Sequence, residues 1–84
     1  MLPVVVRAEG RDYVGVLRDI SVAGIFLYAA IPAVVGTDIQ VTIKPCAADP
    51  DLMVRCRGRV VRVESHEGGA ATGLAVAILG YLRD

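Results

Sequence analysis

The polar residues whose types and spacing could do chemistry gather in one short segment, R-D-I-S-V-A-G, from Arg18 to Gly24. The Asp19 carboxylate and the Ser21 hydroxyl can close Asx and ST turns by accepting hydrogen bonds from nearby backbone N–H groups. Gly24 permits a backbone φ above zero, which several turn types require. On these residues alone, the segment is interpreted as a structural turn at the junction of two strands.

Catalytic chemistry has few candidate side chains. A Ser-His-acid triad would need Ser21 to meet His66, the only histidine, which lies in an expected turn. Cys46, Cys56 and His66 are spaced ten residues apart, a separation that matches no structural zinc pattern. The sequence also contains no phosphate-loop or dinucleotide-binding fingerprint. We therefore predict that the chain is not an enzyme and holds no metal and no cofactor.

Length and composition predict one small folded domain. Eighty-four residues, 55% of them hydrophobic and 21% charged, suffice for a single core over residues 1–84 but not for two. Nine Lys and Arg balance nine Asp and Glu, which argues against a strongly cationic nucleic-acid binder. The mean hydropathy of +0.57 is high for a small soluble domain. We therefore expect apolar surface kept for a subunit, another domain or a missing segment.

A membrane span is the main alternative to a soluble domain. The stretch Ile20–Thr37 is uncharged and near the length of a transmembrane helix, but Ser, Gly and Pro interrupt it. Its apolar part, Gly24–Val35, is too short to cross the hydrocarbon core, and no signal peptide is visible at Met1. We expect a cytoplasmic protein that is not transmembrane, in which Cys46 and Cys56 are reduced.

Short apolar and alternating segments, separated by Gly, Pro and Asp, predict an all-β fold. So many short strands in so few residues favour a small closed or nearly closed antiparallel β-barrel, because closure removes exposed sheet edges. A three-residue hairpin loop, Glu9-Gly10-Arg11, is expected to join the first two strands, and loops are expected at Ala29–Gly36, Cys46–Asp51 and Ser65–Ala70. The six predicted strands are Leu2–Ala8, Asp12–Arg18, Gly24–Tyr28, Asp38–Lys44, Leu52–Glu64 and Thr72–Leu79.

Two of these strands carry more specific signals. In Asp38–Lys44 the apolar residues Ile39, Val41 and Ile43 share one face, the pattern of a half-buried antiparallel strand. In Leu52–Glu64 the apolar residues Val54, Cys56 and Val60 are on one parity, whereas Val61 and Val63 are on the other. This change of parity predicts a bulge or sharp bend between Gly58 and Val61.

The D-x-S-x-x-G spacing of Asp19, Ser21 and Gly24, followed by Ile25-Phe26-Leu27, resembles the second motif of the PilZ domain family, bacterial receptors of cyclic di-GMP. The strand patterns are similar as well, and the resemblance covers nearly the whole chain. It implies a six-stranded antiparallel barrel with little or no helix and a regulatory role as a second-messenger sensor. The similar strand segments are Leu2–Val6, Gly36–Val41, Cys56–Val61 and Gly73–Val76.

The resemblance also implies a ligand site. Asp19 would accept a hydrogen bond from a guanine N–H, Ser21 would donate or accept nearby, and Gly24 would keep the loop tight, with Arg18 beside them. The family's other motif, an R-x-x-x-R pair, lies upstream of the first strand. Arg7 and Arg11 have this spacing but follow that strand, so they are interpreted as surface residues, with a ligand role as the alternative. Without an opposing arginine pair, Asp19 would place a negative charge beside the anionic ligand. We therefore expect weak or absent binding of the ligand.

Two other functions stay open. A PilZ-like barrel could bind a protein partner or form a homodimer through a contiguous apolar patch, and bind no nucleotide. A small barrel could also bind nucleic acid through Arg55, Arg57, Arg59 and Arg62, but such a stripe is more often a solvated strand face. The chain has no Trp and one Phe, whereas single-strand binders need stacking aromatics. We therefore expect no DNA or RNA partner.

Overall fold

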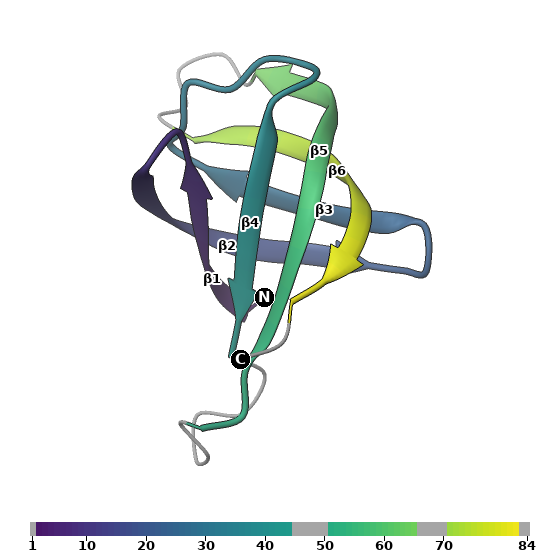
Figure 1. Ribbon diagram of the computed structural model, residues 1–84. Helices are drawn as coiled ribbons and strands as arrows, with labels where there is room; N and C mark the ends of the chain where they lie inside the picture. The colour runs from purple at the N-terminus through teal and green to yellow at the C-terminus, as the bar shows by residue number, and fades with distance from the viewer. Residues whose placement is uncertain (1, 45–50, 66–70, 83–84) are drawn as a thin grey trace.

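Six β-strands make up the described part of the chain. The computed structural model describes residues 2–44, 51–65 and 71–82, and these ranges contain strands and connections but no helix. Figure 1 shows the strands wrapping around a single interior. The strands are β1 (Leu2–Ala8), β2 (Arg11–Ile20), β3 (Gly24–Ala29), β4 (Asp38–Ile43), β5 (Val54–Ser65) and β6 (Thr72–Tyr81).

The strands close into an antiparallel barrel in the order β1-β2-β3-β6-β5-β4. The pairing of β1 with β4 completes the ring, so that every strand has two hydrogen-bonded neighbours. This confirms the prediction of an all-β, six-stranded antiparallel barrel. Closure matters physically because it satisfies the backbone N–H and C=O groups that an open sheet would leave at its edges.

The barrel interior is wholly apolar among the described residues. Ile39, Val41 and Ile43 are buried, whereas Asp38 on the same strand is exposed, which confirms the alternation predicted for β4. Packing of branched aliphatic side chains from all six strands excludes water from the interior and supplies the main driving force for folding. The buried residues are Val4, Val6, Ala8, Leu17, Ile25, Leu27, Ala29, Ile31, Ile39, Val41, Ile43, Cys56, Val60, Leu74 and Val76.

The first hairpin differs from the predicted three-residue loop. Ala8 pairs directly with Arg11, so the turn contains only Glu9 and Gly10, whose φ angles are 51° and 78°. Positive φ at both central residues is the conformation of a two-residue type I′ turn, whose twist matches that of the flanking strands. Arg11 is therefore the first residue of β2 and not part of the loop.

Other strand ends also differ from the prediction. β2 continues to Ile20, β5 begins at Val54 and not at Leu52, and β6 continues through Gly80 to Tyr81. Gly80 does not end the strand because its backbone still pairs with Arg57 of β5. The loops predicted at Cys46–Asp51 and Ser65–Ala70 fall mainly on residues 45–50 and 66–70, which lie outside the described residues. Cys46 and His66 are among these residues.

The predicted irregularity in β5 is confirmed. The register of β5 against β6 shifts between Arg57 and Gly58 and again between Val60 and Arg62. Val63 packs against the core beyond the second shift, as the change of parity predicted, but Val61 is 53% exposed and contributes nothing to the interior. Val61 is the extra residue of a bulge, and Val61 and Arg62 therefore both face outward.

A second bulge, which the sequence did not predict, interrupts β2. Leu17 pairs with Leu27 and Asp19 pairs with Phe26, so Arg18 is the extra residue. Arg18 and Asp19 consequently lie side by side on the outer surface, after the buried Leu17. In the described ranges, no helical segment of a length and apolarity that could traverse a lipid bilayer is found.

Candidate functional site

The turn between β2 and β3 is organised around Ser21. Its backbone N–H donates a hydrogen bond to the Gly24 carbonyl at 2.9 Å, and its Oγ accepts one from the Ala23 N–H at 3.2 Å. The second bond is that of the structural ST turn expected from the residue types, and the first is a backbone bond that closes the turn between β2 and β3. Because Oγ acts here as an acceptor, the Ser21 hydroxyl can still donate its own proton to a group above the turn.

Gly24 is required for a different reason from the one proposed on sequence. Its φ is not in the left-handed region, which among the described glycines is found only at Gly10 and Gly36. A Cβ at this position would instead collide with the backbone carbonyl oxygen of Val76 on β6. Gly24 therefore lets β3 and β6 approach closely beside the turn, which leaves a shallow surface there.

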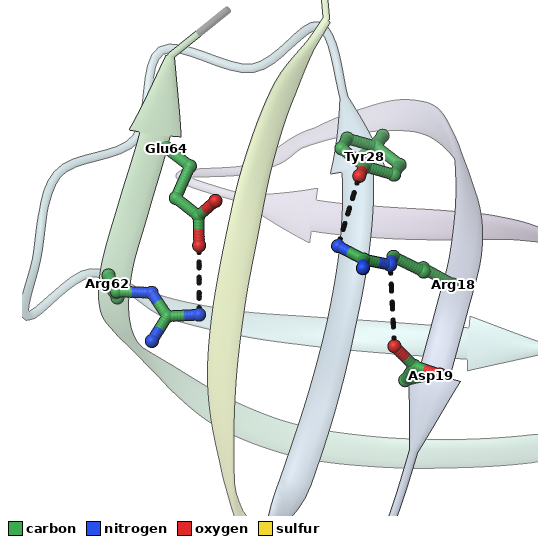
Figure 2. Close-up of polar contacts among 5 residues, drawn as sticks. All are labelled: Arg18, Asp19, Tyr28, Arg62 and Glu64. Atoms are coloured by element: carbon green, nitrogen blue, oxygen red, sulfur yellow. Dashed lines mark hydrogen bonds and ion pairs between the residues drawn. The ribbon is translucent and has the colours of Figure 1, made fainter.

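The bulge at Arg18 places a cation and an anion next to each other. Arg18 Nε lies 3.5 Å from Asp19 Oδ2, and Arg18 Nη1 donates a hydrogen bond to the Tyr28 hydroxyl at 3.3 Å (Figure 2). The Arg18 side chain remains 52% exposed and the Asp19 side chain 73% exposed. At such exposure the ion pair contributes little to stability, so both groups can exchange partners with a ligand at low cost.

An open concavity of about 460 Å³ adjoins this turn. This volume is within the range of small-molecule sites, ~300–1,000 Å³. Asp19, Ser21 and Gly24 border it, and its floor is built from small residues of β6, so the surface can be approached closely by a ligand. The complete lining is Asp19, Ser21, Ala23, Gly24, Ile25, Phe26, Val61, Arg62, Ala75, Val76 and Ala77.

Strand register aligns four residues across this concavity. Asp19 pairs with Phe26, Phe26 with Ala75, and Ala75 with Arg62, so one row crosses β2, β3, β6 and β5. Neighbouring strands are ~4.8 Å apart, so the row spans ~14 Å between the outermost backbones. The row places an acidic side chain at one end, an aromatic ring and a methyl group in the middle, and a guanidinium at the other end.

Phe26 is the aromatic centre of this face. Its ring packs edge-to-face on Tyr28, with centroids 5.4 Å apart, and lies against Gly73, which has no side chain to obstruct it. The guanidinium carbon of Arg18 lies 5.2 Å from the centroid of the Phe26 ring. Arg18 does not line the concavity itself, but it lies beside Phe26 and Asp19, which do, and is attracted by the negative face of the ring.

Arg7 and Arg11 lie elsewhere on the barrel. Both are exposed at the β1–β2 hairpin, at the opposite end of β2 from Asp19, and Arg7 pairs with Asp12 at 3.1 Å. Arg7 borders a second, smaller concavity of about 230 Å³ with Glu9, Asp38 and Arg57. The structure therefore brings Asp19, Ser21, Gly24 and Arg18 together and leaves Arg7 and Arg11 apart from them.

Sequence reasoning missed the far side of the concavity. Phe26 entered the prediction only as part of the apolar strand that follows the D-x-S-x-x-G motif, and Arg62 only as part of a stripe of four arginines. The change of parity at Val61 was the one signal available, because it indicated that residues after the bulge change their direction. That signal does not say which strand lies opposite, so the neighbourhood of Arg62 could not be derived from it.

The described residues offer little other reactive chemistry. They contain no group of three His, Cys, Asp or Glu side chains placed to hold a metal ion. Cys56 is a free thiol that is 1% exposed, and its burial raises its pKa above the ordinary value of 9.0, although a backbone hydrogen bond involving Val41 acts in the opposite direction. A thiol whose neutral form is favoured in this way is a poor nucleophile.

Comparison with known proteins gives one family-level result. Residues 1–81 match the family model of the PilZ domain. No curated protein matches the chain.

Proposed function

This chain belongs to the PilZ domain family, and from that membership we propose that it is a regulatory domain that binds cyclic di-GMP. The family is regulatory and non-catalytic. Its role in second-messenger signalling makes a bacterial cytoplasm the location that we propose for this protein. The observation that supports the proposal in this chain is the meeting of Asp19, Ser21 and Gly24 at one open concavity of about 460 Å³.

Each motif residue has a defined part in the proposed binding. The exposed Asp19 carboxylate accepts hydrogen bonds from the N–H groups of a guanine edge, and the Ser21 hydroxyl donates to a nearby ligand oxygen. Gly24 contributes no polar group, but its missing Cβ lets the ligand rest on the β3–β6 surface. Arg18 offsets the negative charge of Asp19, which would otherwise repel the ligand's phosphates.

Calorimetric titration of cyclic di-GMP into the chain at low salt tests this proposal. We expect saturable binding, and we expect Asp19→Asn to weaken it by ~10- to 100-fold, the range for a lost hydrogen bond to a charged group. Asp12→Asn is the matched control, since Asp12 also forms an ion pair with an arginine, Arg7 of β1, but lies at the other end of β2. No heat at millimolar cyclic di-GMP, or equal losses in both variants, would contradict the proposal.

A protein-binding role is the second candidate, and exposed aliphatic residues on β1 and β2 favour it. Val5 pairs with Val14 and Pro3 pairs with Val16 on the outer barrel face, where Val14 is 78% exposed. An apolar concavity of about 170 Å³ is lined by Pro3, Val5 and Val14, together with Thr42 and Lys44. Contiguous exposed apolar surface of this kind is typical of interaction sites.

Sedimentation velocity over a range of protein concentrations tests the homodimer form of this second candidate. Self-association that Val14→Lys abolishes would support it, because a charge would be buried in the interface. A monomer at every concentration, together with nucleotide binding, would instead leave the cyclic di-GMP proposal as the function of the barrel.

A further inference from the structure

Arg62 reaches the candidate site only because β5 is bulged. Val61 is the extra residue between two register positions, Val60 opposite Val76 and Arg62 opposite Ala75. Since Ala75 pairs on its other side with Phe26, Arg62 faces the same outer surface as the D-x-S-x-x-G turn. Its sequence position, 41 residues beyond Ser21, gives no hint of this proximity.

Two guanidiniums converge on the aromatic centre of the site. The Cζ atom of Arg18 lies 5.2 Å from the Phe26 ring centroid, and that of Arg62 lies 6.0 Å from it. Figure 2 shows the two side chains extending toward one another, Arg62 from β5 and Arg18 from β2, with β6 and β3 between them. One ring that attracts two cations brings together positive charges that would otherwise repel each other.

The present partner of Arg62 shows what its guanidinium can bind. Arg62 Nη2 lies 2.9 Å from Glu64 Oε2, so an anionic oxygen already occupies a hydrogen-bonding position at its tip. The Arg62 side chain is 64% exposed and the Glu64 side chain 41% exposed, which keeps this pair open to exchange. A phosphate offers the same oxygen geometry with a charge that a guanidinium can bind through two N–H groups.

We propose that Arg62 is a ligand-binding residue of this site and that it contacts a phosphate of cyclic di-GMP, opposite Arg18. The inference rests on the proposed function and adds a binding residue outside the D-x-S-x-x-G motif. The ligand displaces Glu64 from Arg62 and lies over Ala75 and Phe26, with a guanidinium on each side. The barrel surface itself thereby carries the pair of positive charges that an anionic dinucleotide requires.

The position of these charges bears on the expectation of weak ligand binding. Asp19 and Glu64 are the carboxylates of the described residues that pair with the two guanidiniums at this face. Their charges cancel those of Arg18 and Arg62 in the free protein, and a phosphate that replaces Glu64 restores the balance at Arg62. The prediction of weak binding considered only Asp19 without an opposing pair, and Arg18 with Arg62 is such a pair on the barrel itself.

Calorimetric titration of cyclic di-GMP into the whole chain and three single variants tests the inference. We expect Arg62→Gln to weaken binding by at least ~10-fold and Arg62→Lys to give an intermediate loss, since Lys retains the charge but not the two-pronged geometry. Arg57→Gln is the matched control, because it removes one positive charge from the outer face of the same strand, at a residue that borders the other concavity.

The outcomes separate this inference from the proposed function. Wild-type binding with a loss confined to the Arg62 variants supports both. Wild-type binding that Arg62→Gln and Arg57→Gln weaken equally overturns the inference and leaves the proposed function standing. No wild-type binding at millimolar ligand overturns both. Thermal unfolding of each variant, expected to match the wild type because these arginines are exposed, excludes misfolding as the cause of a loss.

Discussion

The guanidiniums of Arg18 and Arg62 are both held by acidic neighbours, so any anionic ligand must compete with a carboxylate. Glu64 is the closer competitor, at 2.9 Å from Arg62, whereas Asp19 lies 3.5 Å from Arg18. Asp19 has a proposed use of its own as an acceptor for guanine N–H groups, but Glu64 has none. The two carboxylates should therefore have opposite effects on affinity, although they carry the same charge.

Replacement of Glu64 by Gln should strengthen cyclic di-GMP binding at low salt by ~2- to 10-fold, because it removes one negative charge from a site that binds an anion. The gain should shrink as salt is raised, since screening weakens exposed charges. The measurement is calorimetric titration at two salt concentrations, with Glu9→Gln in the first hairpin as the control. Weaker binding by Glu64→Gln would show that Glu64 orients Arg62 and does not compete with the ligand.

At the level of the strands, two bulges and one close contact shape the site. The bulges at Arg18 and Val61 lie on the strands that flank the β3–β6 pair, and each turns an arginine toward that pair. Gly24 and the small side chains of Ala75 and Ala77 keep the surface between them low. Bulges next to functional surfaces are common because they change the direction of a side chain without altering the rest of the strand.

Substitution of Gly24 by Ala should destabilise the barrel by ~1–3 kcal/mol, since the added methyl group would collide with the Val76 carbonyl and force β3 and β6 apart. Gly80→Ala is the control, because a Cβ there meets nothing within 4 Å and Gly80 lies in β6, the strand against which Gly24 of β3 packs. Its effect should remain within ~0.5 kcal/mol. Urea unfolding monitored by circular dichroism measures both values, and equal effects would argue against the steric explanation.

For the whole molecule, closure of the barrel separates an apolar interior from the outer surface on which the candidate site lies. The concavity that we assign to the ligand is formed by outward-facing residues, so ligand binding does not require the core to open. Cys56 belongs to that core, at 1% exposure, and its thiol reports whether the interior stays closed. The barrel thus serves as a rigid support that holds the four strands of the site in register.

The Cys56 thiol should be protected in the folded protein. In a Cys46→Ser background, its reaction with a disulfide reagent at pH 8 should be at least ~100-fold slower than in denaturant, because reaction requires the barrel to open. Burial raises its pKa above 9.0, so the folded state favours the protonated thiol. The stability from this shift is fully present below pH 9.0 and is lost as pH rises through the higher folded-state pKa.

Comparison with Cys56→Ala in the same background isolates this contribution. The stability of Cys56→Ala should fall less steeply above pH 9.0, because the titrating thiol is missing while the other basic and phenolic groups remain. Equal pH dependence in the two proteins, measured by urea unfolding, would show that the thiol does not titrate differently in the folded and unfolded states.

Much of the fold could be predicted because β-structure leaves local signals. The alternation of Ile39, Val41 and Ile43 specified which face of β4 is buried, since successive side chains of a strand point to opposite faces. The change of parity around Val61 located a bulge for the same reason. The first turn was predicted one residue too long because its Gly also suits a three-residue hairpin loop, whereas the backbone of Arg11 pairs with Ala8.

The candidate site was predictable only where it is continuous in sequence. Asp19, Ser21 and Gly24 lie within six residues, so their residue types predicted a polar turn there and their spacing carried the resemblance to the PilZ motif. The meeting of Arg18, Phe26 and Arg62 depends on the pairing of β3 with β6 and of β6 with β5. Such long-range register is decided by the closed packing of the whole barrel and leaves no signal in the local sequence. Only the tertiary structure therefore placed a second arginine beside the motif.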